Sequence, residues 1–383
     1  MLRKIRIAAA AFFFVLTTLL FLDFTGTLHA WFGWMAKIQF LPALLALNVG
    51  VVAFLVILTL LFGRVYCSVI CPLGVMQDIV SWASGKRRKH RNRFAYSPAL
   101  TWLRRGMLVV FVAAMLAGVG SLLAPYSAYG RIASNLLAPV YAWGNNLLAY
   151  IAGRMDSYAF YSVDVWMKSL STLLVAVVTF AVLFVLAWRN GRTYCNTICP
   201  VGTVLGFLAR YSLFKPRFDT SKCNGCKLCA RNCKASCIDP AAHKIDYSRC
   251  VACMDCLENC RQGAITYTLR RRKPDPAPAP QRPAADAAKT PSDASRRRFL
   301  GLAGIVAYSA LRAQEKKVDG GLAVIVDKKI PNRATPVVPP GAQSLRHFNA
   351  HCTGCQLCVS VCPNQVLRPS GKLMTLMQLE MSC

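Results

Sequence analysis

Two four-cysteine runs carry the strongest chemical signal in the chain. They read CNGCKLCARNC over 223–233 and CVACMDCLENC over 250–260, and both have the spacing Cys-x2-Cys-x2-Cys-x3-Cys. This spacing is typical of bacterial ferredoxins, in which three thiolates of a run bind one cluster and the fourth binds the other. A zinc site would need only Cys-x2-Cys pairs. The sequence therefore predicts two 4Fe-4S clusters, one bound by Cys223, Cys226, Cys229 and Cys260 and the other by Cys250, Cys253, Cys256 and Cys233.

Four residues in and around these runs bear on the properties of the two predicted clusters. Lys234 and Arg261 follow the fourth cysteines, where such runs carry proline. Positive charge at these positions is expected to raise the reduction potential of the adjacent cluster. Gly225 lies inside the first run, where the absence of a side chain lets the loop approach the inorganic cube. Cys237 is a ninth cysteine of this region, and we interpret it as a spare thiol.

A third run, CTGCQLCVSVCP, occupies 352–363 and keeps its proline. Its first three cysteines would bind one 4Fe-4S cluster, and its fourth would serve a second run. No second run follows before the last residue. We interpret the segment as a two-cluster domain cut short; the alternative is that Cys362 or Cys383 completes a single site. The predicted ligands are Cys352, Cys355, Cys358 and Cys362.

A different cysteine pattern occurs twice, as GRVYCSVICPLG at 63–74 and GRTYCNTICPVG at 191–202. The two stretches agree at 8 of 12 positions and are offset by 128 residues, which indicates an internal repeat. Proline is favoured at the first position of a helix. We therefore expect new helices to begin at Pro72 and Pro200, each capped by the preceding cysteine.

The repeat cysteines are predicted to form one shared site. Each motif follows a long apolar segment, so both emerge at the same depth and could face each other. The helix dipole at each cap, together with Arg64 and Arg192, favours thiolates. Redox-active thiols, local disulfides and structural cysteines are the alternatives. The predicted ligands of an iron–sulfur cluster or another metal are Cys67, Cys71, Cys195 and Cys199.

The elements that position these motifs are predicted to be membrane-spanning helices. Hydrophobic residues make up 55% of the 383-residue chain and charged residues only 16%, which is too apolar for an ordinary soluble protein. A span needs about 20 apolar residues. The charge-free segments that approach or exceed this length are 7–22, 38–62, 106–124 and 169–188. The first has no clear cleavage site for a signal peptidase, so we interpret it as a retained anchor.

The distribution of basic residues predicts the orientation. The net charge is +30, and residues 64–105 carry nine Lys or Arg, including KRRKHRNR at 86–93. Residues 126–168 carry only three. Basic loops stay on the cytoplasmic side, so the N-terminus and the segment after Trp188 are expected there. Anionic lipid explains the basic run more simply than nucleic acid does, and no nucleic-acid partner is predicted.

The sequence therefore divides into five parts. Residues 1–214 form a membrane domain with two repeats, and 215–270 form a small α+β, two-cluster ferredoxin domain in the cytoplasm. Residues 271–295 are rich in Pro and Ala and are expected to be a disordered linker. The stretch SRRRFLGLAG then matches a twin-arginine export pattern, with 296–312 as a fifth span. Residues 313–383 are expected to be an exported ferredoxin-like segment.

With these motifs in place, residues 1–270 resemble the NapH-type membrane polyferredoxins, which carry the paired GRVYCSVICP and GRTYCNTICP stretches ahead of a two-cluster ferredoxin. The architecture is also similar to part of the NosR-type regulators and of the CcoG-type oxidase accessory proteins. The tail resembles the exported NapG-type ferredoxins, so the chain looks like a NapH–NapG fusion. This resemblance implies a protein of the bacterial inner membrane that passes electrons from the quinol pool to a periplasmic reductase.

Two other function classes share the first 270 residues: an assembly factor that delivers a metal to a partner enzyme, and a regulator whose clusters sense redox state. The exported ferredoxin run favours the electron carrier, because a maturation factor has less need of a cluster on the far side. No haem-attachment or nucleotide-binding motif is present. A quinone site cannot be assigned, although His29, Trp31 and the outer loop PYSAYGRI could line one. The terminal acceptor and the oligomeric state are not encoded in any motif.

Overall fold

The computed structural model describes residues 2–23, 26–86, 94–116, 123–155, 161–163, 165, 170–269, 318–319, 323–324, 348, 351–362, 367–369 and 379–381. The chain divides into two compact units. One comprises Met1–Arg270 with Thr335–Cys383, and the other comprises Arg271–Ala334. In the second unit the structure describes a short antiparallel pair, β5 (Val318–Asp319) and β6 (Ala323–Val324). The expected linker, the twin-arginine stretch and Cys383 lie outside the described residues.

The first repeat is built from helices. They are α1 (Leu2–Leu22), α2 (Thr27–Phe32), α3 (Trp34–Lys37), α4 (Phe40–Leu45), α5 (Val49–Phe62), α6 (Val65–Val69) and α7 (Pro72–Gly85). The chain turns sharply at Gly63, whose φ of 76° suits a residue without a side chain. The short α6 then carries the first cysteine of the motif. Helix α7 begins at Pro72 with Cys71 as its N-cap, as the sequence predicts.

The second repeat follows a similar plan, with additional helices between its apolar segments. Its elements are α8 (Thr101–Leu116), α9 (Pro125–Ile132), the π-helical turn η3 (Ala133–Leu137), α10 (Ala138–Arg154), α11 (Leu170–Asn190), α12 (Thr193–Thr197) and α13 (Pro200–Ala209). The second motif again turns at a glycine, Gly191, with φ of 69°. Helix α13 begins at Pro200, and the Cys199 sulfur accepts the backbone N–H of Gly202 at 3.4 Å.

The ferredoxin region forms the small α+β domain that the cysteine runs predict. Its elements are β1 (Phe214–Phe218), the 3-10 turn η4 (Thr220–Lys222), α14 (Leu228–Arg231), β2 (Ile238–Asp239), β3 (Lys244–Ile245), α15 (Asp255–Asn259) and β4 (Ile265–Leu269). The outer strands β1 and β4 pair antiparallel, with Phe214 opposite Leu269. Strands β2 and β3 form a second antiparallel pair. The third run contributes α18 (Leu357–Val361), β7 (Leu367–Pro369) and β8 (Leu379–Met381).

Among the described residues, two helices are long and apolar enough to cross a membrane, α1 and α11. In each, only 22% of the apolar window is buried, whereas the core helix of a soluble protein would be mostly buried. They match the predicted spans 7–22 and 169–188. The other predicted spans are not confirmed among the described residues.

Two expectations for the apolar segments are wrong. The segment 38–62 is not one continuous span, because it breaks between α4 and α5, where Leu47 has a φ of 50° and the Asn48 side chain caps α5. The stretch PYSAYGRI is not a loop, because it forms the helix α9, whose eight residues are all buried. Helix α8 begins five residues before the predicted span 106–124, and residues 117–122 of that span lie outside the described residues.

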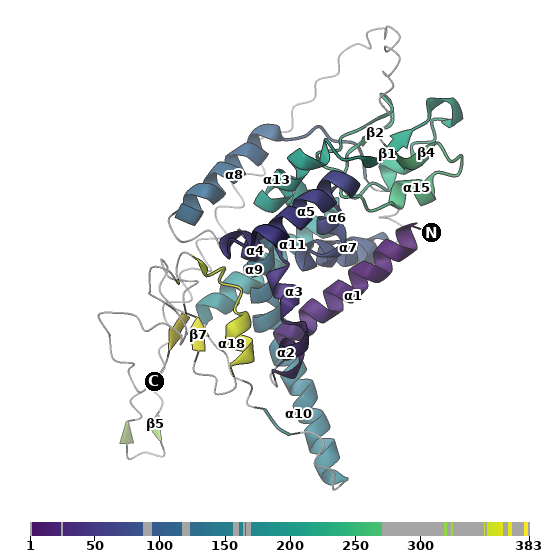
Figure 1. Cartoon of the computed structure of the whole chain (residues 1–383). Coiled ribbons are helices and arrows are strands. Elements are labelled where there is room, and N and C mark those ends of the chain that lie inside the picture. Colours follow the sequence, from purple (N-terminus) through teal and green to yellow (C-terminus); the bar gives the residue numbers. More distant parts are fainter. Residues whose placement is uncertain are drawn as a thin grey trace, which may run out of the picture. The chain divides into compact units, whose positions relative to one another are not determined.

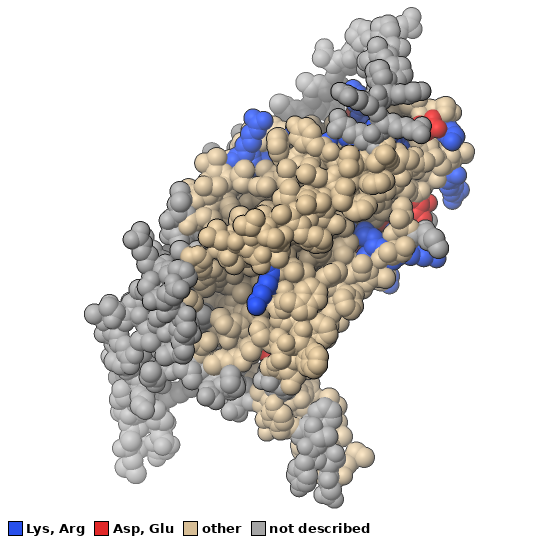
Figure 2. All heavy atoms as spheres, viewed as in Figure 1, with Lys and Arg blue, Asp and Glu red and all other residues tan. Residues whose placement is uncertain are grey.

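The main core is centred on the repeat motifs. It combines Leu20 and Phe21 of α1, Tyr66 and Tyr194 of the motifs and the four repeat cysteines. The outer surface of the helices is apolar, with Phe12, Phe54 and Val178 among the exposed side chains. Figure 2 shows one face, on which Lys and Arg side chains lie mostly toward the end that carries β1 and β4 in Figure 1. Such a surface fits contact with lipid.

Candidate iron–sulfur centres

The eight predicted ferredoxin ligands line two separate cavities. One is lined by Cys223, Cys226, Cys229 and Cys260, together with Phe218 and Ile265. The other is lined by Cys233, Cys250, Cys253 and Cys256, together with Cys237 and apolar side chains. Each cavity thus joins three cysteines of one run with the fourth cysteine of the other run. These are the two sets that the ferredoxin spacing predicts, and their soft thiol donors suit iron–sulfur clusters.

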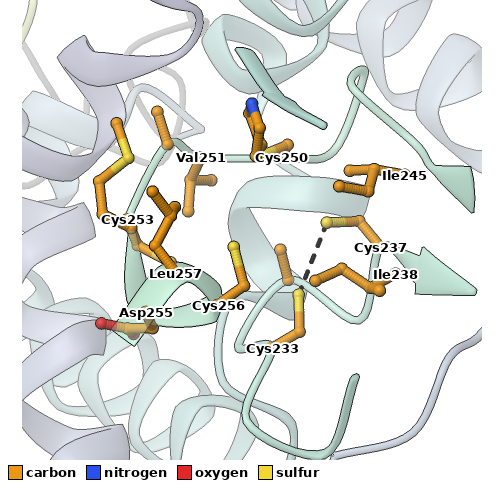
Figure 3. A pocket seen from close by; sticks show the side chains of 14 residues that line it. Cys233, Cys237, Ile238, Ile245, Cys250, Val251, Cys253, Asp255, Cys256 and Leu257 are labelled. Atoms are coloured by element: carbon orange, nitrogen blue, oxygen red, sulfur yellow. Dashed lines mark hydrogen bonds between the residues drawn. The ribbon is translucent and has the colours of Figure 1, made fainter. Parts of the chain in front are cut away.

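Cys237 belongs to the second cavity (Figure 3). Its sulfur lies 3.6 Å from the sulfur of Cys233 and is buried. The hydrogen bond between the two sulfur atoms lowers the pKa of the Cys233 thiol. The sequence shows that Cys237 lies four residues after the predicted ligand Cys233, but only the fold brings the two sulfur atoms together. Cys237 is therefore a neighbour of the cluster site rather than a remote spare thiol.

All three cysteine runs share a backbone conformation. The residues just before and just after the second cysteine of each run have positive φ: Gly225 and Lys227, Ala252 and Met254, Gly354 and Gln356. The second member of each pair caps the short helix that carries the third cysteine. Left-handed backbone is costly for residues other than glycine. Its recurrence indicates that the third run forms the same kind of loop as the two ferredoxin runs.

The two repeat motifs are joined by reciprocal arginine contacts. Arg64 of the first motif donates to the carbonyl oxygen of Cys195 at 3.1 Å. Arg192 of the second motif donates to the carbonyl oxygen of Cys67 at 2.6 Å. Both arginines have no exposed surface. The motifs therefore face each other, and the cysteines of both halves lie in one buried core.

Two glycines make this close approach possible. A Cβ on Gly74 would collide with the carbonyl oxygen of Cys67 and would lie 2.8 Å from Arg192. A Cβ on Gly202 would collide with the carbonyl oxygen of Cys195 and would lie 2.8 Å from Arg64. These glycines end the repeated twelve-residue stretches, and their backbone packs directly on the cysteine loops. The sequence shows the repeated glycine but not the contact that requires it.

The charges of the two arginines are balanced differently. Asp78 of α7 lies 2.7 Å from Arg192, 3.1 Å from Arg6 and 3.6 Å from Lys234. Burial opposes ionisation of Asp78, but these cations hold its pKa well below the usual range. Arg64 instead donates to the neutral oxygen atoms of Asn196 and Ser248, at 2.9 and 3.2 Å. Its positive charge therefore lies beside the thiols without a carboxylate contact.

Burial dominates the acid–base properties of the repeat thiols. All four are free and buried. Desolvation raises the pKa of Cys71, Cys195 and Cys199, and the neighbouring cysteines raise those of Cys71 and Cys199 further. At Cys71 and Cys195, burial outweighs the charge of Arg192, which lowers the pKa of both thiols.

The ferredoxin domain packs against the repeat motifs. The backbone N–H of Arg192 donates to the Lys234 carbonyl at 2.9 Å, and Asn196 donates to the Ala235 carbonyl at 3.2 Å. The Lys234 side chain lies 3.0 Å from Asp255 of α15 and also contacts Asp78. The lysine that replaces the expected proline thus joins the two domains. Arg3 adds ion pairs with Asp255 and Glu258, and the N-terminus of α1 lies beside α15 in Figure 1.

The third run lies at the other end of α1. Ser127 of α9 donates to the Thr353 carbonyl, and Asn135 donates to the Gln356 side chain at 2.9 Å. A Cβ on Gly130 would collide with the carbonyl oxygen of Cys355 and press on the ring of Phe21 in α1. The Cys352–Cys358 loop therefore rests on α9 and on the C-terminal end of α1. Cys362, the fourth predicted ligand, is the C-cap of α18, and its role as a ligand stays a prediction.

Within the described residues, no three Cys, His, Asp or Glu side chains converge closely enough to bind a single metal ion. A 4Fe-4S cube separates its thiolates more widely, because four irons and four sulfides lie between them. The residues present fit such a cube in the two ferredoxin cavities. The geometry defines a helical protein with buried, thiol-rich centres.

Comparison with known proteins agrees with this chemistry. A family model described as a 4Fe-4S binding domain matches residues 44–90 and 172–221, and each match contains one repeat motif. A second 4Fe-4S binding domain model matches residues 348–368, which contain the third run. These matches support 4Fe-4S clusters as the cofactors. No solved structure matches the chain.

Three curated relatives resemble the chain over about half of its length. The methylamine utilization ferredoxin-type protein MauN of Paracoccus denitrificans is 28% identical over 45% of this chain and 48% of its own length. The ferredoxin-type protein NapH of Escherichia coli is 29% identical over 50% of this chain and 55% of its own length. The putative electron transport protein YccM of Escherichia coli is 28% identical over 48% of this chain and 44% of its own length. This chain thus spans about half the length of each. The chain is thus similar to ferredoxin-type and electron transport proteins.

Proposed function

We propose that this protein is a membrane-bound iron–sulfur electron carrier that connects the quinol pool to an acceptor on the far side of the cytoplasmic membrane. Its clusters would supply one-electron redox chemistry. The two ferredoxin sets, the repeat cysteines and the third run would each hold a cluster. The protein contributes spacing, burial and charge, so no general acid, base or nucleophile is needed.

The observation that carries this proposal is the packing of the second ferredoxin cavity on the repeat site. Arg64 lies between them: one of its nitrogens is 3.8 Å from the Cys67 sulfur and another is 3.2 Å from the carbonyl of Ser248. Ser248 is two residues before Cys250, a predicted ligand. A single side chain thus contacts both a repeat thiol and the loop that leads to a predicted ferredoxin ligand, and short distances between clusters favour electron transfer.

The third run extends the proposed path across the membrane. Helix α1 has 21 residues, so it is about 30 Å long at 1.5 Å per residue. Its first turn contacts the ferredoxin domain through Arg3, and its last turn, at Phe21, meets the loop of Cys355. In between, Arg131 of α9 lies close enough to Tyr194 and Cys355 to be influenced by both. The repeat site and the third run are linked through these residues.

The quinol donor, the periplasmic reductase and the orientation are further parts of this proposal. The orientation rests on the basic loop at 64–105, and the exported position of residues 313–383 rests on the twin-arginine pattern. The NapH–NapG fusion and the fifth span rest on sequence motifs alone. His29 and Trp31 stay candidates for a quinone site, but α9 is a less suitable one because its side chains are buried.

Anaerobic reduction in detergent tests the proposal. The full-length protein is mixed with a reduced quinol analogue, and its clusters are followed by EPR, with dithionite as the reference reductant. We expect the quinol analogue to reduce clusters that dithionite also reduces. Reduction by dithionite alone would contradict the quinol donor, and metal transfer to a partner enzyme without cluster turnover would support the assembly factor instead.

A further inference from the structure

A groove between α8 and α13 lies beside the proposed electron path, and no cysteine lines it among the described residues. Its volume is about 380 Å³, within the range of roughly 300–1,000 Å³ that is typical of ligand sites. One side is basic and the other is apolar. Its main lining residues are Arg104, Arg105, Arg210, Leu108, Val204 and Phe207.

The basic side carries more positive charge than the protein neutralises. Arg104 is buried and donates through its two terminal nitrogens to Ser248, while its Nε has no hydrogen-bond partner among the described residues. Burial, and then the charges of Arg64, Arg210 and Arg249, lower the pKa of Arg104 to about 10 against the opposing effect of Asp246. Among the residues that the structure describes, no carboxylate lines the groove. An anion would relieve this excess of charge.

The apolar side continues into the lipid-facing surface. After Arg105, α8 carries no charge as far as its end at Leu116. Val109, Val110 and Val112 are exposed beyond the groove on the same helix, and Phe207 is exposed on α13. A change from arginines to exposed valines along one helix is the pattern expected at the headgroup level of a bilayer.

We propose that this groove binds an anionic phospholipid, with its phosphate held by Arg104, Arg105 and Arg210 and its acyl chain against Leu108, Val204 and Phe207. The inference rests on the membrane location proposed above. Arg104 also holds Ser248, two residues before the predicted ligand Cys250. The lipid therefore stabilises the contact between the membrane domain and the ferredoxin domain.

The test uses the full-length, cluster-loaded protein in phosphatidylcholine nanodiscs with increasing phosphatidylglycerol. Bound phosphatidylglycerol is counted by native mass spectrometry, and thermal unfolding is recorded in parallel. The groove variant is Arg105→Gln/Arg210→Gln, in which both changes fall on exposed side chains. The matched control is Arg217→Gln/Arg231→Gln, which removes the same charge from the ferredoxin domain outside the groove.

We expect wild type and control to retain phosphatidylglycerol and to gain thermal stability from it, and the groove variant to bind it at least tenfold more weakly. Equal affinity of wild type and groove variant, or an equal loss in the control, would overturn the proposal. Inorganic phosphate is a separate arm: stabilisation equal to that by phosphatidylglycerol would show an anion site without lipid specificity and would also overturn it. Lipid occupancy is measured independently of electron transfer, so failure of the quinol assay leaves this test intact.

Discussion

At the scale of single residues, Arg64 has the clearest electrostatic role. It is fully buried, contacts the Cys67 sulfur and lies beside the loop of Cys250. A positive charge near thiolate-bound clusters stabilises the reduced form. We predict that Arg64→Gln lowers the midpoint potentials of the clusters at the repeat site and in the second ferredoxin cavity. EPR-monitored redox titration measures both potentials.

The charge-retaining variant Arg64→Lys is the control for this prediction. Its midpoint potentials should stay close to those of wild type, although the lysine loses part of the hydrogen bonding to Asn196 and Ser248. Identical potentials in wild type and Arg64→Gln would show that Arg64 is only a structural link between the domains.

Asp78 provides a second prediction at this scale. It is the carboxylate that balances buried Arg192, so Asp78→Asn leaves that charge uncompensated and is expected to cost about 3–5 kcal/mol of stability. Thermal unfolding in detergent measures the loss, and Asp219→Asn at an exposed site is the control.

Because the pKa of Asp78 is depressed by folding, its contribution is complete above about pH 4 and is lost only as the pH falls through the folded pKa. We therefore expect Asp78 to cause no change in wild-type stability between pH 5 and pH 7.

These contacts also show where reasoning from sequence stops. The sequence identifies Lys234 as a departure from the ferredoxin pattern and predicts an effect on potential. Its ion pairs with Asp78 and Asp255 could not be predicted, because Asp78 precedes it by more than 150 residues. Long-range partners of a charge depend on the packing of whole elements, which local spacing does not encode.

At the scale of elements, the helix starts at Pro72 and Pro200 were predictable, because proline and its preceding residue restrict the backbone locally. The break at Leu47 and the burial of α9 were not. Hydropathy gives no periodic signal in a uniformly apolar stretch such as 38–62, so a turn inside it goes unnoticed. Helix α9 is buried by α1, α7, α11 and the third run, none of which is its neighbour in sequence.

Helix α7 offers a matched pair of glycines for a third prediction. Gly74 packs on the Cys67 carbonyl, whereas Gly85 in the same helix has open space around it. We predict that Gly74→Ala forces the motifs apart, lowers thermal stability and reduces the iron content. Gly85→Ala should be neutral or stabilising by up to about 1 kcal/mol, because alanine favours the helix. Equal behaviour of the two variants, in thermal unfolding and iron analysis, would contradict the close packing of α7 on the motif.

At the scale of the whole molecule, the contact between the ferredoxin domain and the repeat motifs should control the rate of electron flow. Lys234→Gln removes the ion pairs to Asp78 and Asp255 but leaves all cysteines in place. We predict that its clusters are still reduced by dithionite, whereas their reduction by a quinol analogue is several-fold slower in stopped-flow measurements. Lys222→Gln, at an exposed ion pair, should react like wild type. A wild-type rate in Lys234→Gln would show that this contact does not limit transfer.

The central claim is that the repeat cysteines hold a cluster next to the ferredoxin domain. The most direct measurement is the iron and acid-labile sulfide content of anaerobically purified full-length protein, with EPR spectra after dithionite, for wild type, Cys67→Ser/Cys195→Ser and the control Cys237→Ser. The account predicts that the double variant loses about four iron atoms per chain, the content of one 4Fe-4S cluster, while the ferredoxin signals persist in both variants. An unchanged iron count and unchanged spectra in the double variant would contradict it and would leave the repeat cysteines as thiols.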